Sequence, residues 1–80
     1  MADTVSAYIL IQTEVGKAAQ VAQQIASLTG VTLAEDVTGP YDVIVRAEAT
    51  SMDELGRLVV ARVQGVDGIT RTLTCPVVHL

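Results

Sequence analysis

The sequence has few of the side chains that nucleic-acid interfaces use. It contains no tryptophan, no phenylalanine and only two tyrosines. Protein surfaces that bind single-stranded RNA stack bases on exposed aromatic rings, and this chain offers almost none. Lysine and arginine total five and are scattered, against nine aspartates and glutamates, so the net charge is −4. Because nucleic-acid binding depends on cations that neutralise phosphates, we expect no direct nucleic-acid partner.

Histidine and cysteine each occur once. A metal site needs several such ligands at close spacing, and covalent catalysis needs a nucleophile beside a base. We expect His79 to be an exposed terminal residue and Cys75 to be a small packed residue of a strand. A lone cysteine cannot form a disulfide within the chain, which fits the reducing cytoplasm. The sequence therefore predicts no metal, no other cofactor and no enzymatic activity.

Long apolar segments are also missing. The longest run is residues 7–11, whereas a membrane-spanning helix needs about 20 apolar residues. Residues 1–4 are acidic rather than basic and lack the apolar stretch of a signal peptide, so we expect none. Half of all residues are nevertheless apolar, and only 18% are charged. Excess apolar surface without a membrane segment is typical of a subunit interface, so we expect an oligomer and no membrane partner.

The first half of the chain predicts a strand, a helix and a second strand. Residues 7–13 (AYILIQT) are rich in β-branched and aromatic residues, as in a central strand. From residue 15 to residue 28 apolar residues recur at helical spacing, and Gly30 follows where a helix end favours a left-handed residue. Val31, Leu33 and Val37 then alternate with polar residues, which predicts a half-buried strand with these three side chains on one face.

The second half predicts a turn, followed by a strand, a helix and a last strand. Gly39 and Pro40 predict a tight turn before a third strand at residues 41–49. Ser51-Met-Asp-Glu54 has the form of a capping box and opens a second helix that ends at Gly65. Residues 69–77 form the last strand. The order predicts an α+β, ferredoxin-like βαββαβ sandwich, with a four-stranded antiparallel sheet and two helices on one face.

We expect a single domain, residues 1–80, because a chain of this size has one small core. Two helices cover one side of the sheet and leave the other side bare. The bare face carries either Tyr8, Leu10 and Ile44 or the opposite set, and both sets contain large apolar residues. Pairing of sheets between subunits would cover it, so the pattern predicts a dimer.

Acidic residues form no evident acid–base pair. Glu35 and Asp36 are adjacent on a strand, so their side chains should point to opposite faces. Asp53 and Glu54 occupy the first turn of a helix, where the helix dipole favours anions. Tyr41 and Asp42 stand between the turn and an apolar strand, and neither the turn nor the strand requires them there.

The chain resembles the effector-binding domain, or RAM domain, of the Lrp/AsnC family of transcriptional regulators. Residues 37–42 (VTGPYD) match the family's Gly-x-Tyr-Asp hairpin, and residues 65–72 (GVDGITRT) resemble its entry into the last strand. Residues 7–11, with Thr13 and Gly16, resemble the opening strand and the turn into the first helix. The similarity is to stand-alone members without the helix-turn-helix domain. Pro40 stands where the family often has an acidic or polar residue.

The resemblance implies a homodimer formed through the sheets, and dimers that assemble into a ring, commonly an octamer. It also implies a small effector, often an amino acid, bound between dimers. There the hairpin of one subunit lies near the last-strand threonines of a neighbour. Such a module would act on transcription through a partner, for example a full-length Lrp/AsnC relative.

Seven residues are candidates for effector binding: Thr38, Gly39, Tyr41, Asp42, Thr70, Thr72 and Thr74. Asp42 would receive the ammonium group of the effector through a charge-assisted hydrogen bond. Gly39 permits close approach of the backbone, Tyr41 can line the pocket, and the threonines, expected on one face, offer hydroxyls.

Each candidate also has a structural explanation. Asp42 can bond the backbone of the turn, Tyr41 can pack in an interface, and the turn itself needs Gly39. The threonine row can be an exposed strand face. A structural or interaction protein without a ligand thus stays open. So do an ACT-like amino-acid-binding domain, with its site at residues 13–16, and a small dimeric monooxygenase-like enzyme, which the scarcity of aromatics disfavours.

Overall fold

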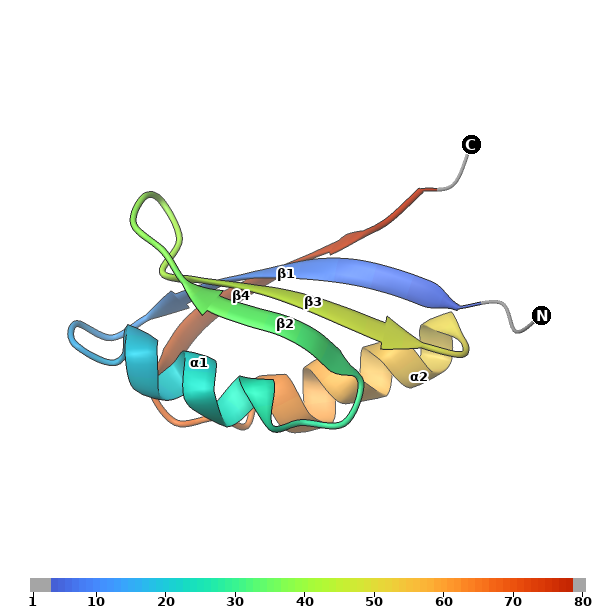
Figure 1. The fold of residues 1–80 in the computed structure, drawn as a ribbon. Helices are drawn as coiled ribbons and strands as arrows, with labels where there is room; N and C mark the ends of the chain where they lie inside the picture. The colour runs from blue at the N-terminus through green and yellow to red at the C-terminus, as the bar shows by residue number, and fades with distance from the viewer. Residues whose placement is uncertain (1–3, 79–80) are drawn as a thin grey trace.

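The computed structural model describes residues 4–78 as one antiparallel sheet covered on one face by two helices (Figure 1). The elements in chain order are β1 (Val5–Thr13), α1 (Ala18–Ala26), β2 (Val31–Asp36), β3 (Val43–Ala49), α2 (Met52–Arg57), η1 (Leu58–Val63) and β4 (Ile69–Pro76). The strands lie in the order β2-β3-β1-β4, and every neighbouring pair is antiparallel. The predicted ferredoxin-like βαββαβ fold is confirmed. None of the helices within residues 4–78 has the length and hydropathy to cross a bilayer.

The core lies between the two central strands and the helices. Alternate residues of β1 and β3 point toward the helices and are buried: Ala7, Ile9, Ile11, Val43, Val45, Ala47 and Ala49. Val21 and Ile25 of α1 and Leu55 and Val63 of the second helix are buried against them. The period of two in both strands thus sends one set of side chains to the core and the other set to the opposite face.

The second helix begins as the sequence predicts. The Ser51 hydroxyl accepts a hydrogen bond from the Glu54 backbone N–H at 3.1 Å. The Glu54 carboxylate does not complete the box as expected but accepts from the Thr50 hydroxyl at 2.6 Å. After Arg57 the helix continues as the π-helical segment η1, where the Gln64 N–H donates to the Val59 carbonyl, five residues back.

Strand β2 corrects one prediction. Its pairing with β3 shifts between Val31 and Leu33, so that Val31 opposes Ala47 while Leu33 opposes Arg46. The prediction that Leu33 shares a face with Val31 is therefore wrong, because a bulge inserts an extra residue and reverses the alternation. Leu33 lies on the open face of the sheet and is 39% exposed.

The open face, opposite the helices, belongs to the even-numbered residues of β1 and β3. Leu10 lies between Ile44 of β3 and Leu73 of β4, and Tyr8 lies beside them. Of the two sets left open by the sequence, this one is bare. Cys75 opposes Tyr8 on the edge strand and is exposed, so the expectation that it is packed is wrong. His79 lies outside the described residues.

Candidate functional site

The turn between β2 and β3, residues 37–42, rises from the sheet on the side away from the helices (Figure 1). Thr38 and Gly39 are exposed at this turn, whereas Tyr41 and Asp42 are half-buried where it enters β3. Gly39 has a φ of +141°, and a Cβ there would meet nothing within 4 Å. The backbone conformation, rather than lack of space, therefore favours glycine at this position.

Asp42 fastens the turn to the end of β1. Its backbone N–H donates to the Ile11 carbonyl at 2.8 Å, and its carboxylate Oδ2 accepts from the Thr13 backbone N–H at 2.8 Å. The β1–β3 ladder ends at the Ile11–Val43 pair. Beyond that pair, the Asp42 carboxylate supplies the acceptor for the Thr13 N–H. Asp42 thus has a structural role, but its carboxylate bonds the end of β1 and not, as the sequence suggested, the backbone of the turn. A carboxylate offers two oxygens and about four acceptor positions, so this bond leaves capacity for a ligand.

Gln12 makes a second contact between β1 and the turn. Its side-chain Nε2 donates to the Pro40 carbonyl at 3.1 Å. Sequence reasoning did not single out Gln12, and its place near the end of a strand was the only available signal. Together with Asp42 it holds the turn over the open side of the sheet.

The threonines of β4 lie elsewhere. Thr72 opposes Ile11 and Thr74 opposes Ile9, and both isoleucines point toward the helices, so these two threonines share the helix side of the sheet. They are half-buried, and the Thr72 hydroxyl accepts from Gln64 Nε2 at 3.2 Å.

Thr70 does not continue this row regularly. The pairing passes from Gln12–Arg71 to Thr13–Ile69, so Thr70 is the extra residue of a bulge. It is exposed. The sequence predicts all three threonines on one face. The strand pairing places only Thr72 and Thr74 on the same face.

Two shallow hollows adjoin the threonines on the helix side. One, of about 310 Å³, is lined mainly by apolar residues of the second helix and by β4: Met52, Leu55, Gly56, Val59, Val60, Gln64 and Thr74. The other, of about 380 Å³, is lined by Gln64, Ile69, Thr70, Arg71 and Thr72. Gln64 borders both hollows, so they lie next to each other along the β4 threonines.

The candidate residues thus form two separate groups within one subunit. The turn group, Thr38 to Asp42, stands on the open side next to the end of β1. Thr72 and Thr74 stand on the helix side of β4, and β1 separates β4 from β3. A site that uses both groups must therefore be completed by a second subunit.

Glu35 and Asp36 of β2 do not form an acid–base pair. Glu35 opposes Ile44 and Asp36 opposes Val43, so these carboxylates lie on opposite faces, as predicted. Within residues 4–78 no three His, Cys, Asp or Glu side chains gather as metal ligands. Every buried side-chain nitrogen or oxygen in that part of the chain has a hydrogen-bond partner.

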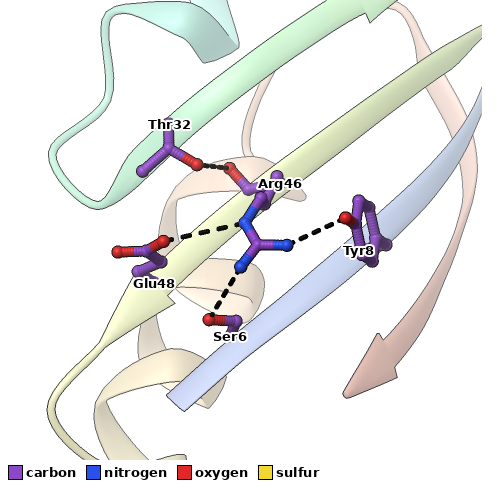
Figure 2. Close-up of polar contacts among 5 residues, drawn as sticks. All are labelled: Ser6, Tyr8, Thr32, Arg46 and Glu48. Carbon is purple, nitrogen blue, oxygen red and sulfur yellow. Dashed lines mark hydrogen bonds and ion pairs between the residues drawn. The ribbon is translucent and has the colours of Figure 1, made fainter. Parts of the chain in front are cut away.

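A polar cluster on the open face was missed by sequence reasoning. The Arg46 guanidinium donates to the Tyr8 hydroxyl at 2.8 Å and to the Ser6 hydroxyl at 3.3 Å, and its Nε lies 3.6 Å from a Glu48 carboxylate oxygen (Figure 2). We call these four residues the Arg46 cluster. The spacing of Arg46 and Glu48 in β3 places them on one face. The contact of Arg46 with β1, however, depends on a strand register that the sequence does not reveal.

With the fold and both groups described, comparison with known proteins is decisive. The family model for the Lrp/AsnC ligand binding domain matches residues 6–79. The chain belongs to the Lrp/AsnC family. An uncharacterized HTH-type transcriptional regulator of Pyrococcus abyssi is 33% identical over 55 residues, which cover 69% of this chain and 37% of the relative. The chain thus matches well under half the length of this relative, which is described as a transcriptional regulator.

Solved structures agree with this Lrp/AsnC assignment. A Thermus thermophilus protein superposes with a TM-score of 0.89 at 26% identity, covering 95% of both chains. Escherichia coli AsnC superposes with a TM-score of 0.86 at 26% identity over 95% of this chain and 52% of AsnC. A Neisseria meningitidis transcriptional regulator, solved as a complex with L-Met, has a TM-score of 0.81 at 18% identity over 94% of this chain and 50% of the regulator, and shares the fold.

Proposed function

We propose that this Lrp/AsnC domain is an effector-binding regulatory module that holds a free amino acid, or a similarly small zwitterion, between subunits. The observation that carries the proposal is the separation of the two candidate groups. The turn with Asp42 and the β4 threonines lie on different sides of one subunit, and can meet only across a contact between subunits. The L-Met complex of a regulator with the same fold supports an amino acid as the ligand class.

The chemistry of the two groups suits the two ends of an amino acid. The ammonium group would be received by the Asp42 carboxylate, in the charge-assisted bond that is the stronger kind. The hydroxyls of Thr72 and Thr74 on the neighbouring subunit can donate to the ligand carboxylate. Thr38, Gly39 and Tyr41 would line the turn side of the site, and Thr70 the bulge side.

Assembly follows from the same arrangement. The open face would pair with a second copy to form a homodimer, since its apolar residues are otherwise left in water. Dimers would join into a ring, up to an octamer, with effector at the contacts between dimers. An effector that bridges two dimers stabilises the arrangement that contains its site and thereby shifts the oligomer distribution. Any effect on transcription would pass through a partner such as a full-length relative.

The experiment is a thermal-unfolding screen against the free proteinogenic amino acids. A ligand present at about 100 times its dissociation constant should stabilise the folded state by about 2.7 kcal/mol. We expect at least one amino acid to raise the unfolding temperature of the wild type but not that of Asp42→Asn. Asp53→Asn, which removes one exposed carboxylate from α2, is the matched control and should respond like the wild type. If no amino acid shifts the wild type, a structural or interaction protein without a ligand becomes the better explanation.

A further inference from the structure

The Arg46 cluster lies on the open face, across the two central strands β1 and β3. The three guanidinium nitrogens of Arg46 each have a partner within the same subunit: Tyr8, Ser6 and Glu48 (Figure 2). The guanidinium carbon lies 5.2 Å from the centre of the Tyr8 ring, within the range of a cation–π contact. Both charges of the cluster are therefore paired before any second subunit arrives.

The charge of the open face favours a second copy of this chain as the partner that covers it. By strand register this face carries Arg46 and Arg71 together with Glu35 and Glu48, and Asp42 stands beside it at the turn, so two cations lie among three carboxylates. The chain as a whole carries a net charge of −4, so most of that negative charge lies outside this face. Two copies that meet through this face therefore bring less like charge together than two copies that meet elsewhere. The occupant that fits is a second copy of this chain.

Covering the open face changes how much the Arg46–Glu48 ion pair contributes to stability. In the isolated subunit the Arg46 and Glu48 side chains are 32% and 39% exposed, and an ion pair in contact with water contributes little to stability. Once the face is covered, an unmatched charge would be strongly unfavourable, while a matched pair is tolerated. Any docking of the second copy that breaks these bonds, or presses an apolar side chain onto the charges, is thereby disfavoured.

We propose that Arg46 is the specificity-determining residue of the subunit interface. With Glu48 and Tyr8 it fixes the one register in which a second copy packs on the open face. Leu10, Ile44 and Leu73 supply the apolar surface that drives association. The inference rests on the homodimer of the proposed function but not on its ligand.

The first test is a double-mutant cycle on the dimer dissociation constant, measured by sedimentation equilibrium without any amino acid. Arg46→Met and Glu48→Gln should each weaken the dimer by about tenfold or more, because each leaves the other member unmatched in the covered face. The combined variant should return to within about threefold of the wild type, because both charges are gone. Arg57→Met, which removes an exposed charge on the helix side, should leave the constant unchanged. Additive losses in the combined variant would overturn the inference.

The second test reads the register directly. Because Cys75 is the single cysteine, Cys75→Ser with Gln23→Cys leaves one site for a spin label, on the exposed surface of α1. In an otherwise wild-type dimer we expect one narrow distance between the two labels. Adding Arg46→Met with Glu48→Gln should give a broad distribution or several distances, although the dimer still forms. An unchanged narrow distance would show that Arg46 does not set the register.

The two proposals fail in different ways. A wild-type chain that stays monomeric at micromolar concentration would overturn this inference together with the assembly it rests on. A wild-type dimer that passes both interface tests but binds no amino acid would defeat only the proposed ligand.

Discussion

At the scale of single residues, Asp42 combines a structural and a proposed binding role. Its carboxylate accepts a hydrogen bond from the part-buried Thr13 N–H, a bond that the carbonyl oxygen of an asparagine can also accept. Charge, by contrast, matters for receiving an ammonium group. The two roles can therefore be separated by choosing the substitution.

We expect Asp42→Asn to lower the free energy of unfolding by less than about 1 kcal/mol, because the bond to Thr13 can be retained. Asp42→Ala leaves that N–H without its partner and should cost about 1–3 kcal/mol. Urea unfolding of both variants measures the difference. Equal losses for the two variants would mean that the carboxylate does not support the turn.

The Ser51 cap is the second prediction at this scale. Ser51→Ala removes the acceptor for the Glu54 N–H and should lower the free energy of unfolding by about 1 kcal/mol. Ser51→Asp keeps an acceptor at the same position and should restore most of that loss in the same urea experiment. If both substitutions behave alike, the cap contributes nothing measurable.

At the scale of elements, the sequence was sufficient where a local pattern decides the structure. The apolar runs of β1 and β3, the cap at Ser51 and the glycine after α1 are all such patterns, and Gly30 indeed has a φ of +95°. Strand ends were less well predicted: β1 begins at Val5 and β3 at Val43, rather than at residues 7 and 41. The ends depend on which neighbouring strand still offers a partner.

Irregular pairing was beyond the sequence for the same reason. The bulge that turns Leu33 outward arises from how β2 meets β3, and the bulge at Thr70 from how β4 meets β1. Neither has a local signal such as a glycine at the affected position. The π-helical segment η1 follows α2 directly. Its apolar residues continue the helical spacing of α2, so the sequence pattern does not mark the change of helix type.

The buried faces of β1 and β3 give a prediction about packing. Ile9 is fully buried between Val45 and Thr74 in the sheet, so Ile9→Val should lower the free energy of unfolding by about 0.5–1.5 kcal/mol. Val60→Ala is a control, because Val60 is 65% exposed and the change should stay within about 0.5 kcal/mol. Chemical denaturation measures both, and a loss at Val60 as large as that at Ile9 would contradict this placement of the core.

At the scale of the whole molecule, the candidate site is divided. The resemblance to Lrp/AsnC domains named the turn and the β4 threonines from sequence alone, and the structure shows on which side of the sheet each lies. The sequence alone could not predict on which side of the sheet these residues lie, because that depends on the register of strand pairing. The Arg46 cluster was unpredictable on the same ground, since it joins β1 to β3 across 38 and 40 positions of the chain.

The open face gives a prediction about association. Leu73 lies on this face and is 43% exposed in the subunit, so Leu73→Asp should place an unpaired charge in the interface and dissociate the dimer. Val60→Asp adds the same charge on the helix side and should leave the dimer intact. Light scattering coupled to size-exclusion chromatography gives the two masses. Dissociation by Val60→Asp but not by Leu73→Asp would place the dimer interface on the helix side instead.

The most direct measurement for a site shared between subunits is sedimentation velocity of the wild type with and without the amino acid that stabilises it most. We expect saturating ligand to shift the distribution between dimers and larger rings, and the midpoint of that shift to depend on protein concentration. The same distribution with and without bound ligand would contradict a shared site. It would mean that the ligand occupies a pocket complete within one subunit.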